Sequence, residues 1–199
     1  MNPGEVTVVP ANQATWDDIQ AIFGTHDAGR CMCQRYMIRD MMWSSFSREE
    51  RAERLREQTC CDDPESPVTS GLVAYLDGEP VGWCAVEPRS AYERLRSMRT
   101  PWTGREEDKD YDTVWAVTCF VTRVGYRKRG LTYPLAKAAV GFARERGAAA
   151  LEGYAMITEP GKEITWGELH VGPLSAYEEA GLRAVSQPSK QRVIMRIDF

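Results

Sequence analysis

The sequence lacks long hydrophobic runs and any excess of positive charge. No segment approaches the ~20 consecutive apolar residues that a membrane-spanning helix needs, and the first residues lack the basic-then-apolar order of a signal peptide. Lys and Arg number 25 against 29 Asp and Glu, which gives a formal charge of −4 at pH 7. General nucleic-acid binders neutralise phosphates with Lys and Arg, so that class is disfavoured. We therefore expect a cytoplasmic protein that binds neither a membrane nor nucleic acid.

Histidine and cysteine are also scarce, with 2 and 6 among 199 residues. Cys31 and Cys33, and the adjacent Cys60 and Cys61, lack the spacing of roughly two to four residues between paired zinc ligands. We expect free thiols and no metal, and the role of these four cysteines stays open. The hydrophobic share of 43% and the charged share of 27% are those of an ordinary globular protein. We predict a single domain over residues 1–199.

Hydrophobic periodicity and turn residues predict an α/β protein. The expected strands are 6–9, 71–76, 81–86, 114–121, 150–156, 164–171 and 193–197, and the expected helices are 15–23, 47–58, 91–99, 131–146 and 174–180. The second and third strands flank the turn sequence Asp77-Gly78-Glu79-Pro80 and so form a hairpin. Because strands and helices alternate in the second half while a hairpin occupies the first, the sheet should be mixed.

The most informative segment joins strand 114–121 to helix 131–146 through a basic turn that contains glycine. Seven basic residues and one acidic residue lie between Arg123 and Arg146. A helix start carries backbone N–H groups without partners, and the helix dipole adds positive potential there. The turn therefore predicts an anion site, the alternative being a solvated basic helix face.

Residues 125–132 also come within one residue of the phosphate-binding loop G-x-x-x-x-G-K-[ST]. The mismatch is Leu131, which stands where that loop needs a lysine to reach the terminal phosphates. No downstream apolar strand ends in an aspartate that would hold magnesium. Hydrolysis of ATP or GTP is therefore disfavoured.

The same turn resembles motif A of the GCN5-related N-acetyltransferases (GNAT), [QR]-x-x-G-x-[GA], with Arg127, Gly130 and Thr132 at the three defined positions. Downstream, residues 177–182 resemble the Y-E-x-x-G-F signature of that family. The threonine of the first motif and the final leucine of the second depart from the pattern. The resemblance covers residues 114–182 and implies a GNAT fold. That is an α/β fold with a mixed, mostly antiparallel central sheet, splayed at its fourth and fifth strands, and helices on both faces.

The resemblance implies acetyl-CoA as the cosubstrate. The pantetheine arm would bind the backbone of Cys119, Phe120 and Val121, and a backbone N–H near Val121 would polarise the thioester carbonyl. The pyrophosphate would bind Arg127, Lys128, Arg129, Gly130, Leu131 and Thr132. Tyr177 would be the general acid that protonates the leaving thiolate, because a phenol and an alkyl thiol have similar pKa values. The alternative for Tyr177 is a core aromatic residue.

The general base is less well defined. Some members of the family carry a glutamate early in the fourth strand, whereas this chain has Thr113-Val114-Trp115 there. Alternation along the expected strand 164–171 places Trp166, Glu168 and His170 on one face. His170 or Glu168 is the candidate base, since a histidine titrates near neutral pH. Glu152 is a weaker candidate.

Charge predicts a cationic amine as the acceptor. The loop before strand 114–121 contains five acidic and two basic residues between positions 105 and 112. Such a loop attracts cations if it borders the cleft, the alternative being a solvated loop. The residues expected to contact the acceptor are Tyr36, Trp43, Glu152, Trp166, Glu106, Asp110 and Asp112.

Segment 30–46 is rich in Cys, Met and aromatic residues, which suits either a cleft lining or a cover over the core. The combination of residues 30–36, the sequence WGELHVG at 166–172 and the C-terminal sequence 193–199 resembles the aminoglycoside 2'-N-acetyltransferases that act on kasugamycin. That resemblance implies acetylation of a small amine and antibiotic resistance. The alternatives are a protein amine as acceptor and a CoA-binding module without activity. A homodimer is a further expectation, since dimers are common in the family.

Overall fold

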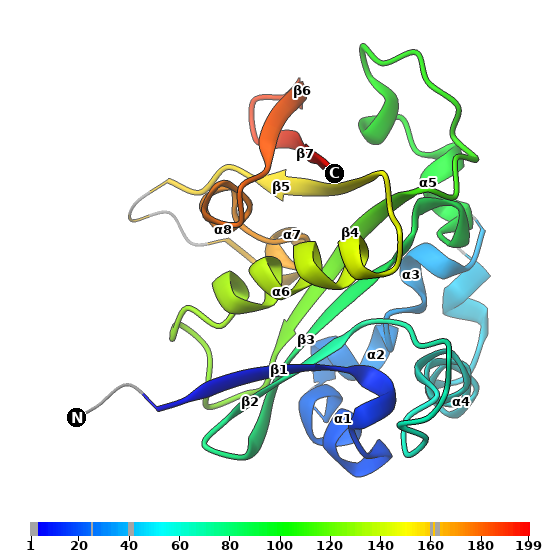
Figure 1. The fold of residues 1–199 in the computed structure, drawn as a ribbon, viewed down its shortest axis with the longest axis vertical. Coiled ribbons are helices and arrows are strands. Elements are labelled where there is room, and N and C mark those ends of the chain that lie inside the picture. The colour runs from blue at the N-terminus through cyan, green and yellow to red at the C-terminus, as the bar shows by residue number, and fades with distance from the viewer. Residues whose placement is uncertain (1–3, 25, 40–41, 160, 162–163) are drawn as a thin grey trace.

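The computed structural model describes residues 4–24, 26–39, 42–159, 161 and 164–199, apart from the side chains of His26, Asp27 and Trp166. Seven strands form one sheet in the order β1-β2-β3-β4-β5-β7-β6 (Figure 1). They are β1 (Val6–Pro10), β2 (Leu72–Leu76), β3 (Glu79–Pro88), β4 (Val114–Thr122), β5 (Ala150–Met156), β6 (Arg183–Ser189) and β7 (Arg192–Asp198). Every neighbouring pair is antiparallel except β4 and β5, which confirms the predicted mixed, mostly antiparallel sheet.

Two helix starts follow directly from the sequence. The side chains of Thr15 and Ser47 each accept a hydrogen bond from the amide three residues on, and Asp18 and Glu50 return the bond. The helices are α1 (Trp16–Phe23), α2 (His26–Cys31), α3 (Gln34–Met37), α4 (Arg48–Thr59), α5 (Glu93–Ser97), α6 (Thr132–Glu145), α7 (Trp166–Leu169) and α8 (Leu174–Glu179), with 3-10 turns at 11–13, 42–45, 89–91 and 100–102. None of the described helices combines the length and the apolar character that crossing a membrane requires.

The hairpin of β2 and β3 closes as the sequence predicts. Leu76 pairs with Glu79, which leaves Asp77 and Gly78 as the two turn residues. Their φ angles of +52° and +83° are left-handed, and a two-residue turn of this hand matches the twist of the flanking strands.

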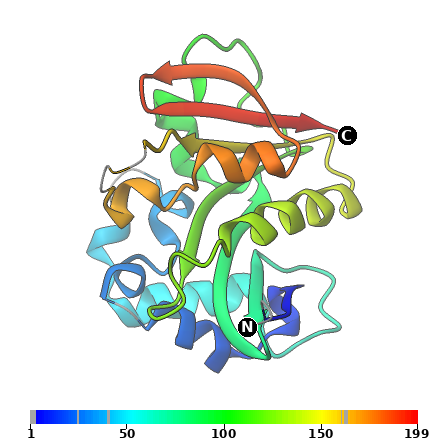
Figure 2. The same ribbon diagram turned by 90° about the vertical axis from the view of Figure 1, so that its left-hand side faces the viewer.

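Helices cover both faces of the sheet (Figure 2). On one face, α6 and α8 pack through residues such as Leu135, Phe142 and Tyr177 against the apolar side chains of β2 to β5. On the other face, α1 and its neighbours pack residues such as Ile19 against Trp83 of β3. Both layers are built from alternating side chains of the same strands, as expected for a sheet buried on both sides.

The one parallel pair, β4 and β5, is joined over only part of its length. Residues 114–117 pair with 150–153, and beyond that point the strands separate. The later segment 170–173 lies between the diverging ends, where the Phe120 amide donates to the His170 carbonyl at 2.6 Å. The splay predicted for the fourth and fifth strands is therefore present.

The strand predicted at 164–171 is wrong. Residues 166–169 form α7, and the Glu168 carboxylate accepts hydrogen bonds from the amide and the hydroxyl of Thr165 at 3.2 and 2.9 Å. This is the capping geometry of a T-x-x-E sequence, which favours a helix start over an alternating strand. Trp166, Glu168 and His170 consequently do not share a strand face.

The edge strand β6 is absent from the sequence prediction. Its residues 183–189 are largely exposed, and the strand contains Pro188. Proline cannot donate to a β-ladder and is tolerated at an edge, so neither hydrophobic alternation nor composition indicates this strand. The helix predicted at 91–99 is shorter than expected, because a 3-10 turn at 89–91 precedes α5.

A carboxyl group partly buried on β3 makes stability depend on pH. Burial raises the pKa of Glu87 from 4.5 to about 7. The folded state therefore binds a proton more tightly than the unfolded chain, and this contribution to stability is lost as pH rises from about 4.5 to about 7. We expect Glu87→Gln to be more stable than the wild type above neutral pH, by about 1–3 kcal/mol, with a smaller difference at pH ~5.

Urea denaturation at the two pH values measures this difference. The matched control is Glu53→Gln on the exposed side of α4, which should change stability by the same small amount at both. An equal effect of Glu87→Gln at both pH values would contradict the assignment.

Candidate active site

A cavity of about 400 Å³ opens at the end of β4. The end of β4, the basic turn, the start of α6 and segment 164–173 enclose it, with the lining residues Phe120, Thr122, Tyr126, Arg127, Lys128, Arg129, Gly130, Leu131, Thr132, Ile164, Leu169, His170 and Pro173. All six residues predicted to bind the pyrophosphate are among them. We call this space the turn cavity.

The basic turn is shaped to bind an anion. Gly125, Lys128 and Gly130 have φ angles of +91°, +63° and +75°, and such left-handed residues point successive amides to one side. Within the described part of the chain, the amides from Arg127 to Thr132 donate no hydrogen bond. They lie at the start of α6, where the helix dipole adds positive potential. Free amides, the dipole and basic side chains together suit the pyrophosphate of CoA.

The direction of the amides along β4 refines one prediction. Arg123 donates its amide to Val81 of β3, while Phe120 donates toward segment 170–173. Successive backbone amides of a strand point to opposite sides of it. The Val121 amide therefore faces β3, and the amides of Phe120 and Thr122 face the turn cavity. The Val121 amide itself therefore faces away from the cavity, and the predicted N–H near Val121 has to come from a neighbouring residue. The Phe120 amide already donates to His170, which leaves Thr122 as the candidate donor.

A second cavity of about 230 Å³ lies against the first. Its described lining residues are Arg30, Cys31, Cys33, Arg35, Tyr36, Trp43, Cys119 and His170. His170 lines both cavities. Tyr36 and Trp43 were predicted to face an acceptor, and Cys119, predicted to touch the pantetheine arm, lines this second space instead. We call it the acceptor cavity.

Tyr36 and His170 form a hydrogen-bonded pair in its wall. His170 Nδ1 lies 2.9 Å from the Gly167 carbonyl, and a carbonyl only accepts, so Nδ1 carries a proton. In the neutral ring Nε2 then accepts from the Tyr36 hydroxyl, 3.1 Å away. Burial raises the pKa of Tyr36, so its phenol stays protonated. The pair can move a proton from the cavity to the imidazole.

Tyr177 is buried at the point where β4 and β5 separate. A Cβ at Gly153 would overlap its ring, so that glycine makes room for the tyrosine. The hydroxyl donates to the Val171 carbonyl at 2.6 Å, and burial raises the pKa of Tyr177 well above 10. Its phenol therefore holds its proton firmly. The partner of the hydroxyl, Val171, is the residue that follows His170.

Comparison with known proteins identifies the family. Residues 35–158 match the model of the Acetyltransferase (GNAT) family. The chain belongs to the GNAT acetyltransferases. This confirms, at the level of the family, the prediction of an enzyme that uses acetyl-CoA. No curated protein sequence matches this GNAT chain.

Solved structures agree with the GNAT fold. One is yncA from Salmonella typhimurium, assigned as an acetyltransferase and solved with acetyl-CoA, with 12% identity, a TM-score of 0.54 and coverage of 97% of this chain and 93% of that one. A GCN5-related N-acetyltransferase from Kribbella flavida has 14% identity, a TM-score of 0.53 and 98% coverage of both chains. A ribosomal-protein-alanine N-acetyltransferase from Brucella melitensis has 14% identity, a TM-score of 0.53 and coverage of 97% and 99%. At these identities the likeness shows the fold.

Two predicted site residues of this GNAT enzyme lie outside both cavities. Glu168 caps α7 and lines neither cavity. Glu152 is fully buried and is held by the guanidinium groups of Arg89, Arg105 and Arg196. Neither carboxylate is placed to accept a proton from an acceptor amine. The side chain of Trp166, a third predicted contact, lies outside the described part.

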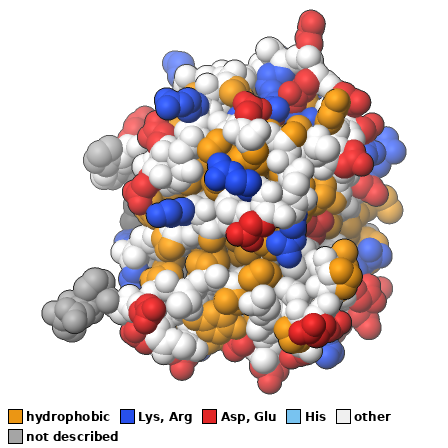
Figure 3. Space-filling view, viewed as in Figure 1, with side chains coloured by type: hydrophobic (Ala, Val, Ile, Leu, Met, Phe, Trp, Pro, Cys, Tyr) orange, Lys and Arg blue, Asp and Glu red, His pale blue; other side chains and the backbone are white. Residues whose placement is uncertain are grey.

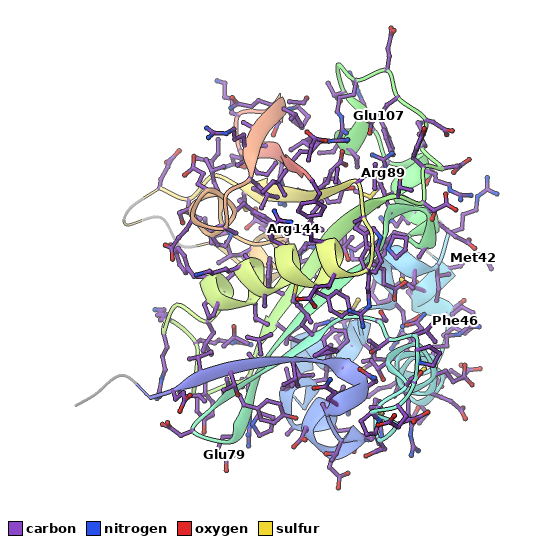
Figure 4. All side chains as sticks on the ribbon, viewed as in Figure 1. Met42, Phe46, Glu79, Arg89, Glu107 and Arg144 are labelled. Atoms are coloured by element: carbon purple, nitrogen blue, oxygen red, sulfur yellow. The ribbon has the colours of Figure 1, made fainter. Side chains whose placement is uncertain are left out.

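The acidic loop lies at the other end of β4. It precedes Val114, whereas the basic turn follows Thr122 (Figure 1). Glu106, Asp110 and Asp112 line neither cavity. Figure 4 shows Glu107 and Arg89 at this end, where they form an ion pair, and Figure 3 shows acidic and basic side chains side by side there. The two cavities therefore give no support to the predicted contact between the acidic loop and the acceptor, which stays a prediction.

Sequence reasoning did not single out Arg30, Arg35, Cys31 and Cys33 as site residues. Their signal was present, because all four belong to the segment whose Met and aromatic content suits a cleft. All six cysteines are free, and no described group of three or more His, Cys, Asp or Glu side chains could hold a metal ion.

Glu152 is expected to be a structural carboxylate. Replacing it with glutamine leaves three guanidinium groups close together with one fewer negative charge, so Glu152→Gln should destabilise the protein by about 3–5 kcal/mol. Urea unfolding measures the change. The control Glu106→Gln, at an exposed position in the loop before β4, should stay within about 0.5 kcal/mol of the wild type. Unchanged stability together with lost activity would instead return Glu152 to the catalytic site.

Proposed function

We propose that this enzyme transfers the acetyl group of acetyl-CoA to a primary amine of a small molecule, by direct attack when both are bound. The observation that carries the proposal is His170, which lines both cavities. A base at that position reaches an amine in the acceptor cavity and a thioester at the end of the turn cavity. Geometry comes first for such an assignment.

The turn cavity fits CoA in charge and in shape. The free amides of Arg127 to Thr132 would bind the pyrophosphate, and the cleft-facing edge of β4 at Thr122 would run beside the pantetheine arm. Bound there, acetyl-CoA supplies an activated acetyl group and a thiolate leaving group. The Thr122 amide is the candidate donor to the thioester carbonyl, where it would stabilise developing negative charge.

The residues of the chain account for both protons. As the amine nitrogen bonds to the acetyl carbon and the carbon–sulfur bond breaks, the Tyr36 oxygen accepts the amine proton and passes its own to His170 Nε2. Tyr177 gives its proton to the leaving sulfur. The His170 and Tyr177 roles keep those predicted from the sequence, and Tyr36 gains a relay role. The pair also supplies a base where β4 lacks the glutamate of some relatives.

An acceptor panel tests the proposal. Purified protein and acetyl-CoA are incubated with small amines that include aminoglycosides such as kasugamycin, and with peptides that carry free N-termini or lysines. Intact mass reads the acetylation. Acetylation of a small amine supports the proposal. Acetylation of peptides alone favours the protein-amine alternative, and CoA binding without turnover favours the binding module. Light scattering on the same sample tests the expected homodimer.

His170 is expected to set the pH dependence. A base must be unprotonated, so wild-type activity should rise with pH through the imidazole pKa. His170→Gln should lower kcat by about a hundredfold or more and remove this rise. The acceptor is chosen so that its amine stays neutral across the range. Tyr36→Phe, the matched test of the relay, should also lower kcat. A His170→Gln enzyme that keeps the wild-type profile would remove the base assignment.

Tyr177 is expected to act on the leaving thiolate. Tyr177→Phe should lower kcat by about a hundredfold and leave CoA affinity nearly unchanged, because the hydroxyl bonds the Val171 carbonyl in the free enzyme and would act on the sulfur only as the carbon–sulfur bond breaks. Thermal unfolding separates this effect from the loss of the bond to Val171. An acetyl donor with a more acidic leaving thiol should lose less activity, since it needs less help from an acid. A folded and fully active variant would show that Tyr177 is only a core residue.

A further inference from the structure

The acceptor cavity has a cationic wall. Arg30 at the end of α2 and Arg35 on α3 both line it, and none of its described lining residues carries a carboxylate. This is the reverse of the charge expected for a site that binds polycations. Arg35 is half-buried and Arg30 is exposed. Opposite charges attract most strongly where water is partly excluded, so an anionic ligand would gain most from Arg35.

Neither guanidinium is neutralised by a side chain that the structure describes. Within the described ranges, Arg30 and Arg35 form no ion pair, whereas Arg89, Arg105 and Arg196 are all paired. The paired arginines therefore stabilise the fold, whereas the charges of Arg30 and Arg35 are available to a ligand. Arginine is also the side chain that best matches a carboxylate, through two parallel hydrogen bonds.

The charged groups around the catalytic pair point the same way. Burial raises the pKa of Tyr36, and three nearby cations, Arg35, Arg192 and Arg94, act to lower it. These three guanidinium groups add positive potential at the Tyr36 hydroxyl, in the wall of the acceptor cavity.

Hydrogen-bond donors also outnumber acceptors behind this wall. Arg51 donates to the Trp43 carbonyl at 3.1 Å and lies over the Trp43 ring. The remaining Nε of Arg51 and the indole nitrogen of Trp43 are buried without a partner in the described structure. Unpaired buried donors are costly, and a nearby anion lowers that cost.

We propose that Arg30 and Arg35 form a carboxylate subsite and that the acceptor is a small amine that carries a carboxylate close to its nitrogen, as an amino acid does. The inference rests on the proposed acetyl transfer, since it places this carboxylate beside the amine that reacts. The cavity volume of about 230 Å³ suits a molecule of that size. It is below the ~300–1,000 Å³ of sites for drug-sized ligands.

Matched acceptors test the subsite. Alanine, leucine, methionine and phenylalanine are each compared with the corresponding amide and with the decarboxylated amine. For each acceptor, kcat/KM is calculated from the concentration of the unprotonated form. The preferred amino acid should exceed both partners by ~10-fold or more, the range of a charge-assisted hydrogen bond. The double variant Arg30→Gln/Arg35→Gln should lower the ratio of kcat/KM between that amino acid and its amide by ~10–100-fold, and the ratio cancels any effect that Arg35 has on both acceptors through Tyr36. Arg35→Glu should reverse the preference.

The control and the readouts separate this inference from the proposed function. Arg183→Gln, on exposed β6, should leave the preference unchanged. Equal rates on an amino acid and its amide would overturn the subsite while acetyl transfer stands. If none of the panel is acetylated, thermal unfolding with CoA decides. Stabilisation by an amino acid in the wild type, absent in the double variant, supports the subsite, and no stabilisation overturns it. If no amine of the wider panel is acetylated, the result counts against the proposed acetyl transfer and not against the subsite.

Discussion

The separation of β4 from β5 is the constraint on which the rest of the molecule depends. The two strands pair over 114–117 and 150–153 and then diverge, which leaves cleft-facing amides of β4 without a neighbouring strand. Segment 170–173 enters this gap and brings His170 to the boundary of two cavities. The basic turn lies just beyond, because α6 must return across the sheet from the end of β4. Cofactor site, acceptor site and candidate base all follow from one break in strand pairing.

A buried ion cluster holds the paired ends of these strands together. Glu152 of β5 contacts three arginines that come from the turn after β3, the loop before β4, and β7. A buried ion cluster contributes little more to stability than hydrophobic residues of the same size would, but removing one of its partners lowers stability strongly. It therefore fixes how these segments meet at one end of the parallel pair while the other end stays open. Glu107, from the loop before β4, belongs to the same cluster through its ion pairs with the three arginines.

Much of the fold could be predicted because the deciding signals are local. The capping boxes at Thr15 and Ser47 and the turn at Asp77 and Gly78 each depend on side chains within a few residues. The strand predicted at 164–171 failed although its signal was also local, since Thr165 and Glu168 form a helix cap that outweighs alternation. Edge strand β6 could not be predicted in the same way, because its pairing with β7 depends on a partner that only the folded sheet supplies.

The sequence by itself determined the anion-binding turn and the family, because a strand, glycines, basic residues and a helix start follow one another along the chain. Only the tertiary structure decided which charged residues share a space. Tyr36 and His170 are 134 positions apart yet hydrogen bonded. Glu107, which precedes β4, pairs with arginines at the end of that strand that lies away from the two cavities. The sequence gives the number and sign of the charged residues, whereas the effect of each charge on a ligand depends on distance and burial. The sign of the acceptor cavity is therefore a property of the fold.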